Sequence, residues 1–355
     1  MNSSKHNLSG GVEENQKVLM FDGSWKKIKD IVSGDTIWSI SQKTFRRHPR
    51  IVKENIFLGK KDVYEFNVSG GSKLLCTYDQ KIYNTISPKS SFGHPKVVEE
   101  PLVLEKEGVY EFNVREESKQ KTYKPTGFSD LKEITTESKI YTPMFNHKFD
   151  YNESIKKVFF NEIELDKFPN ILFAIGAWIG DGWASTNGRV YIANKNQEFL
   201  DYFSKSLPIK CRLSHKKKYD YSILSSWNPF YRLLEKLNLH DKKAYSKFIP
   251  DIIFQLSKEE KRQFLRGLFA SDGWASGRTI GYASTSEILI RDLKKLLFSF
   301  GIYGTINFKK SQLPGKWRDQ WFFLINKVDN VISFCNEIGI FTKEKAVLSV
   351  LEKAQ

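Results

Sequence analysis

The sequence predicts a two-part protein, in which an all-β domain is followed by an α+β domain that contains one helix–strand–strand–helix unit twice. Between Lys17 and Tyr141, short apolar segments alternate with polar residues and are separated by turn-forming pairs, as in domains built of many short strands. Further on, amphipathic segments alternate with strand-like ones, which is typical of an α+β region. The pentapeptide Asp-Gly-Trp-Ala-Ser occurs at 181–185 and again at 272–276, and this predicts an internal duplication.

The composition excludes several classes of protein. A length of 355 residues suggests two or three domains, and 40% hydrophobic with 14% aromatic residues excludes a disordered chain. The longest apolar stretch, 171–180, is too short to span a bilayer, and no signal peptide is expected at the start. Three cysteines supply neither a disulfide framework nor a four-cysteine zinc site. The net charge of +15 points to a nucleic-acid partner and no membrane partner.

The first domain shows a hairpin signal and a repeat. Residues 1–10 are polar and are expected to form a flexible leader. The pair Asp22-Gly23 lies between apolar runs and predicts a hairpin. The segment VYEFNV at 63–68 recurs at 109–114, and a Ser-Lys pair recurs at the same offset of 46. Two similar edge strands could arise by chance, but the shared offset favours a duplication.

The second domain is expected to contain two central helices. Pro169 predicts the first turn of one helix, and Ser257 with Glu260 forms a capping box that opens the other. The sequence pattern also predicts helices at 196–207, 230–239, 286–301 and 328–340, and strands at 189–194, 219–226, 305–310 and 320–326. The segment at 237–244 is echoed at 338–346.

Small residues stand four apart on both central helices: Gly176 and Gly180 on the first, Gly267 and Ser271 on the second. Such a stripe allows close approach of another helix. If the stripes meet, the helix ends bring Asp181 and Asp272 side by side. Each carboxylate would then face the negative end of a helix dipole and a second negative charge, an arrangement that a divalent cation stabilises. Paired oxygen ligands suit Mg²⁺ (or Mn²⁺), which supports phosphoryl-transfer chemistry.

A plainer interpretation is that each Asp-Gly only ends a helix, with Gly182 and Gly273 in the left-handed cap conformation. For a single Asp-Gly this interpretation is the better one. Two copies, each followed by Trp-Ala-Ser in a chain of charge +15, favour the metal site.

The central helices resemble the paired motifs of LAGLIDADG homing endonucleases, with LRGLFASDG at 265–273 and the more divergent AIGAWIGDG at 174–182. The resemblance implies two αββαββα-type repeats, at 165–255 and 256–355, in a monomer that cuts both strands of a long asymmetric DNA site. It places catalytic metal at Asp181 and Asp272, with Gly180 and Ser271 as further metal-site residues, and a catalytic, positively charged residue near the metal in each repeat, at Lys218 and Lys316. These lysines could equally contact phosphates or solvent. An offset of 100 would align Lys218 with Arg318 and Lys216 with Lys316.

The first domain, 11–150, resembles the Hint domain of inteins in the segments 11–31 and 73–81. The positions that serve splicing hold Gly11, which has no nucleophile, and Gln80, which is no general acid, so no self-splicing is expected. A splicing-inactive Hint domain fused to a paired LAGLIDADG unit resembles the mating-type-switching endonucleases of yeasts and their intein relatives. In such relatives this domain also contacts DNA, a role that Lys119, Lys121 and Lys124 fit as well as they fit a solvated loop.

The resulting hypothesis is a site-specific endonuclease whose sheets lie in the major groove of double-stranded DNA. It would act in the nucleus of a eukaryote or the cytoplasm of a prokaryote. The alternatives are a cleavage-inactive DNA-binding regulator or RNA maturase, and, third, an autoprocessing protein, which Gly11 and Gln80 oppose. The side chains expected on the DNA-binding sheets are Arg189, Lys195, Arg212, Lys216, Arg278, Lys309 and Arg318.

Overall fold

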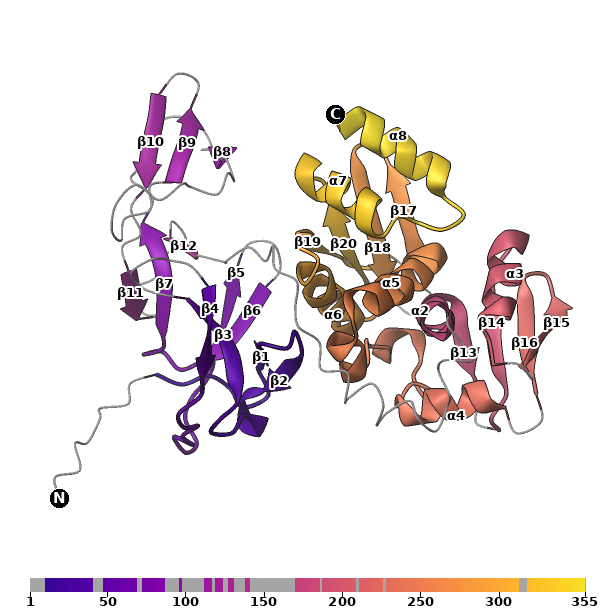
Figure 1. Cartoon of the computed structure of the whole chain (residues 1–355), viewed down its shortest axis with the longest axis horizontal. Helices are drawn as coiled ribbons and strands as arrows, with labels where there is room; N and C mark the ends of the chain where they lie inside the picture. Colours follow the sequence, from indigo (N-terminus) through magenta and orange to yellow (C-terminus); the bar gives the residue numbers. More distant parts are fainter. Residues whose placement is uncertain are drawn as a thin grey trace. The chain divides into compact units, whose positions relative to one another are not determined.

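The computed structural model of the chain describes residues 10–40, 47–68, 72–86, 96–97, 112–116, 119–123, 127–130, 138–140, 170–185, 187–208, 211–225, 228–312 and 318–354. Its contacts divide the chain into two units, one mainly within residues 1–144 and the other mainly within residues 145–355 (Figure 1). No helix within the described ranges is long and apolar enough to cross a membrane.

The described elements of the first unit are short strands, as the alternating pattern predicts, and one 3₁₀ turn at Ile28–Asp30. They form small sheets of two or three strands. The assignment of the whole unit to one all-β fold stays a prediction. The strands are β1 (Lys17–Leu19), β2 (Trp25–Lys27), β3 (Thr36–Ile40), β4 (Arg47–Ile51), β5 (Tyr64–Val68), β6 (Ser72–Cys76), β7 (Lys81–Ile86), β8 (Lys96–Val97), β9 (Phe112–Glu116), β10 (Lys119–Tyr123), β11 (Gly127–Asp130) and β12 (Ser138–Ile140).

Two predicted local features of this unit are present. The Asp22-Gly23 pair lies in the loop between β1 and β2, which pair antiparallel with Leu19 opposite Trp25, and Gly23 has a φ of 83°. Both copies of the repeated segment form the first strand of a pair, β5 with β6 and β9 with β10. In the second copy, the described part of the strand, β9, begins at Phe112. The two copies therefore share a local structure as well as a sequence.

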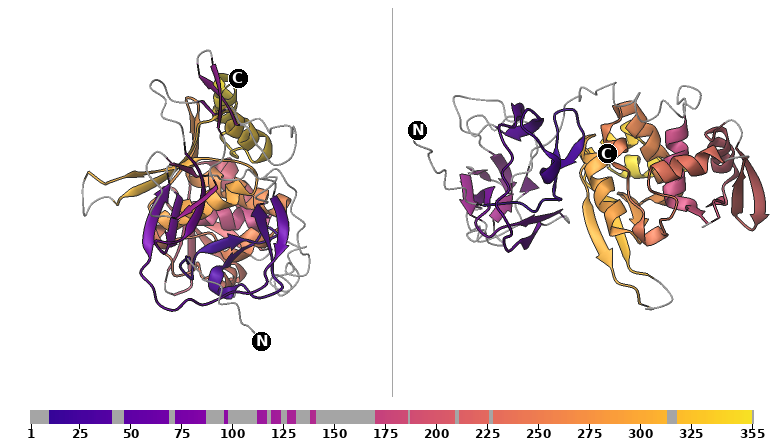
Figure 2. Two further views of the ribbon diagram at one scale, coloured as in Figure 1. Left: turned by 90° about the vertical axis from the view of Figure 1, so that its left-hand side faces the viewer. Right: turned by 90° about the horizontal axis from the view of Figure 1, so that it is seen from below.

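The second unit contains the same arrangement twice. In each repeat a central helix leads into a four-stranded sheet, with the strand orders β13-β14-β16-β15 and β17-β18-β20-β19. Figure 2 shows the β19–β20 hairpin projecting as a long arm. The first repeat comprises α2 (Ile171–Asp181), β13 (Gly182–Ala184), β14 (Val190–Ala193), α3 (Gln197–Lys205), β15 (Arg212–Lys217), β16 (Asp220–Leu224) and α4 (Pro229–Lys236). The second comprises α5 (Lys258–Asp272), β17 (Gly273–Ser276), β18 (Thr279–Ser284), α6 (Glu287–Phe298), β19 (Thr305–Lys309), β20 (Gln320–Ile325), α7 (Val328–Glu337) and α8 (Glu344–Ala354).

The αββαββα order confirms the α+β architecture of this half, and its helix starts follow from local chemistry. The capping box of Ser257 and Glu260 opens α5 as predicted. The first central helix begins at Ile171, after Asn170, so Pro169 lies before its first turn and outside the described residues. The strands β15 and β18 and the last helix, α8, were not predicted, and neither were the two short strands β13 and β17. The two strands escape prediction because they are three or four residues long and begin directly at a helix end.

The two central helices lie side by side in the core (Figure 1). All of α2 from Ile171 to Ile179 is buried, as expected of a helix that is apolar on every side. A Cβ on Gly176 would overlap the backbone of Phe264, and a Cβ on Gly267 would overlap the backbone of Phe173. The predicted small-residue stripes therefore do meet, and the two helix backbones touch where they cross.

Candidate functional site

Two carboxylates stand at the carboxyl ends of the central helices. Asp181 is the last residue of α2 and Asp272 the last residue of α5. Burial and the charge of Asp272 together raise the pKa of Asp181 to about 7. Burial likewise raises the pKa of Asp272, even though its side chain reaches the surface. The structure thus brings the two predicted metal ligands together in a setting that disfavours their ionised form.

Gly180 and Ser271 meet directly in front of these carboxylates. A Cβ on Gly180 would overlap the hydroxyl of Ser271, so glycine is needed at this position. The hydroxyl of Ser271 donates to the Leu268 carbonyl at 2.6 Å, which turns it back along its own helix. Both residues bring the helix ends together, and the role of each toward a metal remains a proposal.

The glycines that follow the aspartates have extended backbones. Gly182 has a φ of −98° and Gly273 a φ of −74°, so neither adopts the left-handed conformation of a helix cap. The interpretation of the two Asp-Gly pairs as simple left-handed helix ends is therefore wrong. A Cβ would overlap Trp178 at Gly182 and Phe269 at Gly273, and this explains the glycines. In both repeats the backbone passes directly from the helix into a strand.

Two lysines that the sequence reasoning missed bind the ends of the central helices. The Lys247 ammonium donates to the carbonyl oxygens of Trp178 (3.1 Å), Ile179 (2.8 Å) and Gly182 (2.6 Å). The Lys343 ammonium donates to those of Ser271 (3.0 Å) and Gly273 (2.6 Å). Both charges act on the carboxylates and favour their ionised form. Burial lowers the pKa of Lys247 to about 8 and also lowers that of Lys343.

A sequence similarity between the two repeats points toward this pair, but its alignment is shifted by several residues. The echo between 237–244 and 338–346 would match Lys343 with Lys242, which instead pairs with the neighbouring Asp241. The structural counterpart, Lys247, lies beyond the short 3₁₀ turn at Ala244–Ser246. An insertion in one repeat thus hid the equivalence.

Asp181 has a further partner in Asn194, at the end of β14. The Asn194 side-chain amide donates to Asp181 Oδ2 at 2.7 Å. Its oxygen accepts from the backbone N–H of Asn196 at 2.8 Å, which fixes the orientation of the amide. Both side chains line a pocket of about 470 Å³ that also reaches Lys195, Tyr219 and Lys343.

The two lysines predicted as catalytic have no described contact with the carboxylates. Lys218 lies exposed in the turn between β15 and β16, with a φ of 48°, and its carbonyl meets the His215 ring at 3.1 Å. It precedes Tyr219, which lines the pocket. Lys316 lies outside the described residues. Their catalytic roles remain predictions.

The predicted alignment of basic residues between the repeats needs a correction. Val190 pairs with Ile223 in the first sheet, and its counterpart Ile280 pairs with Ile325 in the second. These registers give an offset of 102 in this strand rather than 100, because the hairpins differ in length. On the preceding strands Ser214 of β15 corresponds to Thr305 of β19, so the extra residues lie in the loop of the second hairpin. Arg318, in that loop, therefore corresponds to neither Lys216 nor Lys218.

Except for Lys119, Lys121 and Lys124, the residues predicted to bind DNA lie on strand and turn surfaces of the second unit. Arg318 places its guanidinium over the Tyr245 ring, 3.9 Å from the centroid, and Lys195 borders the pocket. The others are exposed on β15, at the end of β19, or in the turns before β14 and β18: Arg212, Lys216, Lys309, Arg189 and Arg278. Lys119 and Lys121 lie in β10, and Lys124 lies outside the described residues.

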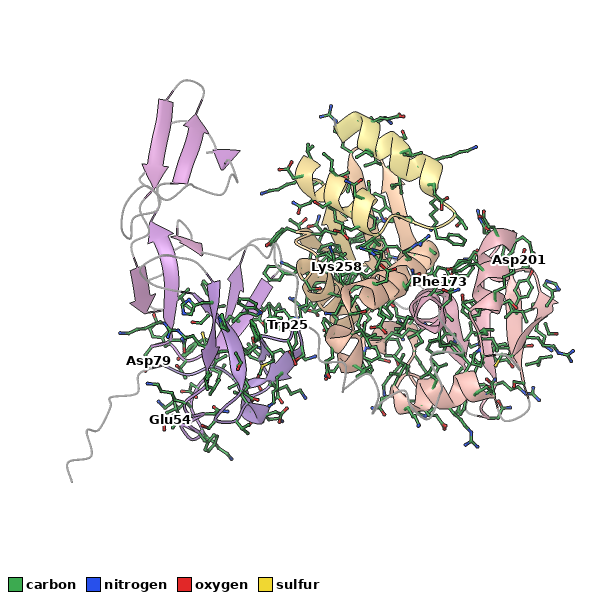
Figure 3. The ribbon with its side chains drawn as sticks, in the orientation of Figure 1. Trp25, Glu54, Asp79, Phe173, Asp201 and Lys258 are labelled. Atoms are coloured by element: carbon green, nitrogen blue, oxygen red, sulfur yellow. The ribbon has the colours of Figure 1, made fainter. Side chains whose placement is uncertain are left out.

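The two positions that the sequence predicts to be degenerate splicing positions, Gly11 and Gln80, are held by hydrogen bonds. The Gly11 N–H donates to the Thr77 hydroxyl at 2.7 Å, and the Gly10 N–H donates to Asp79, labelled in Figure 3, at 2.9 Å. The Gln80 side chain donates to the neighbouring Lys81 carbonyl at 3.0 Å. Gly11 therefore sits in an ordered niche without a nucleophile.

The donor set fits a hard divalent cation. Both carboxylates are disfavoured as ions by burial, and a cation bound to them would relieve this cost. In the described part of the chain, no group of three or more His, Cys, Asp or Glu side chains gathers, so waters or a ligand would complete the shell. A site of one or two carboxylates plus waters is the usual setting of Mg²⁺.

Comparison with known families gives one match. Residues 259–339, most of the second repeat, match the family of the LAGLIDADG-like domain. This confirms the predicted kind of domain for that segment. The first repeat and the Hint-like unit have no such support, and the intein origin and the relation to yeast proteins stay proposals.

Curated proteins of very different activities share segments with this chain. One is the replicative DNA helicase DnaB of Synechocystis, 30% identical over 151 residues, which cover 41% of this chain and 16% of the helicase. Another is glutamine–fructose-6-phosphate aminotransferase of Methanocaldococcus jannaschii, 26% identical over 184 residues, with 50% and 17% covered. A third is the ribonucleoside-diphosphate reductase NrdEB subunit alpha of Bacillus subtilis, 25% identical over 172 residues, with 41% and 16% covered. The chain spans about a sixth of the length of these relatives.

Among solved structures, mesophilic variants of the homing endonuclease I-DmoI are 16% identical with a TM-score of 0.36, over 51% of this chain and 99% of that chain. A structure of I-DmoI with DNA and Mn is 17% identical with a TM-score of 0.34, over 48% and 96%.

Proposed function

We propose that this protein is a site-specific, metal-dependent DNA endonuclease that makes a double-strand break in a long asymmetric target and does not splice itself. The observation that carries the proposal is the pair Asp181 and Asp272. Two carboxylates are held at the ends of backbone-to-backbone helices, one from each repeat. A protein that only bound a polyanion would gain nothing from two adjoining carboxylates.

Asp181 and Asp272 would hold Mg²⁺ or Mn²⁺, and the metal, when bound, would stabilise negative charge at the scissile phosphate. Hydrolysis adds one water across a P–O bond, so the attacking water loses a proton and the leaving oxygen gains one. Asn194 orients the Asp181 carboxylate for this task. Lys247 and Lys343 fix both helix ends and offset the charge of the carboxylates.

Three further observations support a DNA substrate. The LAGLIDADG-like match covers residues 259–339, most of the second repeat, and the helix α5 of that repeat ends at Asp272. The net charge is +15, and the exposed side chains Arg212, Lys216 and Lys309 stand on the outer strands β15 and β19. Such side chains reach phosphates and base edges when a β-ribbon enters the major groove.

The relatives support an origin as an inserted element. A helicase, an aminotransferase and a reductase subunit have no chemistry in common, yet each shares a minor segment with this chain. A chain that resembles minor parts of such unrelated enzymes is not the source of any one of their activities. We infer that it derives from a mobile, intein-like insertion whose splicing positions have become Gly11 and Gln80.

The test is to incubate the protein with randomised duplex DNA and Mg²⁺ and to sequence the cut ends. We expect double-strand breaks at one long site, and Asp181→Asn or Asp272→Asn should abolish cleavage of at least one strand while DNA binding in Ca²⁺ persists. Full cleavage by either variant would refute the metal assignment. DNA or RNA binding without cleavage would make the protein a regulator or maturase instead.

A further inference from the structure

The turn after β14 and the turn after β18 are built alike. Asn196 caps α3 by accepting from the Phe199 N–H, and Ser286 caps α6 by accepting from the Leu289 N–H. In front of each cap, a second side chain accepts from the cap residue's own N–H: Asn194 at 2.8 Å and Ser284 at 3.1 Å. The segments Asn194–Asn196 and Ser284–Ser286 are therefore structural counterparts.

Their side chains differ in the polar atoms that they carry. Asn194 uses its oxygen for the turn and has its amide left to donate to Asp181. Ser284 uses its single hydroxyl oxygen for the same turn and has no second polar atom. Asp181 thus has a fixed amide donor, whereas within the described residues no side chain donates a hydrogen bond to Asp272.

The middle residue of the turn adds a charge to one half only. Lys195 lines the pocket of about 470 Å³ beside Asp181, whereas its counterpart, Thr285, is neutral. Lys343 enters this pocket from the other repeat. Lys195 and Lys343 thus bring two cationic side chains to the pocket that Asp181 lines. Two cations beside one carboxylate form a setting for a phosphate group.

We infer that the two halves of the site are unequal: the pocket formed by Asp181, Asn194, Lys195 and Lys343 holds a DNA phosphate that the other half does not, and the strand in this half is cut first. This inference rests on the proposed endonuclease function. Asn194 acts as a positioning residue for Asp181, and Lys195 as a phosphate contact. One charge-assisted hydrogen bond corresponds to about a tenfold difference in rate.

The experiment exchanges the two turns. The selected target duplex is labelled on each strand, and single-turnover rates with Mg²⁺ are measured for the unchanged protein, for Asn194→Ser with Lys195→Thr, and for Ser284→Asn with Thr285→Lys. We expect the unchanged protein to cut one strand about tenfold faster. The first pair should slow only that strand, and the second pair should speed only the other. Lys205→Thr, the same change at an exposed position of α3, should alter neither rate.

A readout without metal or cleavage separates phosphate binding from a general loss of structure. Ethylation of individual phosphates is scored for interference with binding in EDTA, and one scissile phosphate should interfere more than the other. This difference should vanish in Asn194→Ser with Lys195→Thr, while the urea midpoint of unfolding stays unchanged. Equal rates and equal interference in the unchanged protein would overturn the inference. If neither strand were cut, the proposed function itself would be refuted.

Discussion

Lys247 and Lys343 hold the carboxyl ends of α2 and α5 in the same way, each from the last part of its own repeat. The two contacts differ in depth, because the Lys247 side chain is buried whereas that of Lys343 is only half-buried. Lys247 also lies over the Trp178 ring, 4.7 Å from its centroid. Each ammonium supplies the positive charge that a helix carboxyl end favours.

We therefore expect Lys247→Met to lower the free energy of unfolding by about 3 kcal/mol and Lys343→Met by about 1 kcal/mol. The first change leaves three buried carbonyl oxygens without their donor. Urea unfolding of each variant measures the difference. Lys242→Met removes only a surface ion pair with Asp241 and should have almost no effect. Equal losses for Lys247 and Lys343 would contradict the difference in depth.

The helix crossing should tolerate no added methyl group. Gly267→Ala would push a Cβ into the backbone of Phe173 and should cost about 3 kcal/mol or more, as measured by urea unfolding. Gly180→Ala meets only the side chain of Ser271, so Ser271→Gly should restore part of the loss. Lys205→Ala, exposed at the end of α3, is the control. A Gly267→Ala protein of normal stability would show that the helices can separate.

The stability of the metal-free protein should depend on Asp181. Its pKa is raised from 3.8 to about 7, by burial first and by Asp272 second, and Lys247 and Lys343 act in the opposite direction. The folded state therefore holds this proton more tightly than the unfolded chain does. The stability gained from the proton is complete below pH 3.8 and is lost as the pH rises to about 7.

Asp181→Asn, which stays neutral, should thus be more stable than the unchanged protein at pH 8 in EDTA, by at most about 4 kcal/mol, and the difference should shrink toward pH 5. Urea unfolding at pH 5, 6, 7 and 8 gives the comparison, and Mg²⁺ should stabilise only the unchanged protein. The pKa of Lys247, about 8, lies at the upper end of this range, so Lys247 keeps its charge in the comparison at pH 5 and 6. A variant that is less stable at pH 8 would show that the carboxylate is well solvated.

DNA affinity should fall steeply with salt. The logarithm of the binding constant should fall by about 0.9 per neutralised phosphate for each unit of log salt concentration. Changing Arg212, Lys216 and Lys309 to Gln should reduce the slope by about 0.9 each if each contacts a phosphate. Fluorescence anisotropy at several salt concentrations measures it, with Lys205→Gln as the control. A flat dependence would exclude a long duplex site.

The first unit should not cleave itself. Purified protein treated with a thiol should remain one chain of 355 residues by mass spectrometry, since Gly11 offers no nucleophile. A Cβ at residue 11 would meet Leu58 at 3.3 Å and Thr77 at 3.6 Å, so Gly11→Ala should fold normally and serve as a matched control. A fragment beginning at Gly11 would show that the nucleophile was wrongly placed.

A further test concerns the role of the first unit on DNA. Charge reversal at Lys119, Lys121 and Lys124 should weaken specific binding by about 1 kcal/mol for each lost phosphate contact, and it should shorten the footprint. Footprinting of the selected target measures both effects. An unchanged footprint would leave this unit as a scaffold.

Most helices of the second unit were predictable because their signals are local, whereas the strands β13, β15, β17 and β18 were not. The capping box at Ser257, the small-residue stripes and the doubled Asp-Gly each depend on a few neighbouring residues. The pairing of Lys247 with Lys343 was not predictable, because it depends on which of several lysines folds back onto a helix end across an insertion. Asn194 was missed for a related reason: a single amide after a strand carries no signal until β13 and β14 place it beside Asp181.

At Gly182 and Gly273 the sequence indicates that glycine matters, but it suggests the wrong physical reason for it. Glycine after a helix suggests a left-handed cap, yet both have extended backbones. The absent Cβ makes room for the Trp178 ring at Gly182 and for the backbone and ring of Phe269 at Gly273. Local propensity describes the residue's freedom of conformation, and only the packing shows which use is made of it.

The contact of Gly176 and Gly267 with the opposite backbones has a mechanical consequence. At the helix crossing no side chain stands between the two backbones, so no change of rotamer can widen or narrow it. The distance between the carboxyl ends of α2 and α5 is therefore constant. If one strand is cut at each helix end, the protein and not the DNA sequence determines the stagger between the two cuts. The stagger should then be the same number of base pairs in every target that the enzyme accepts.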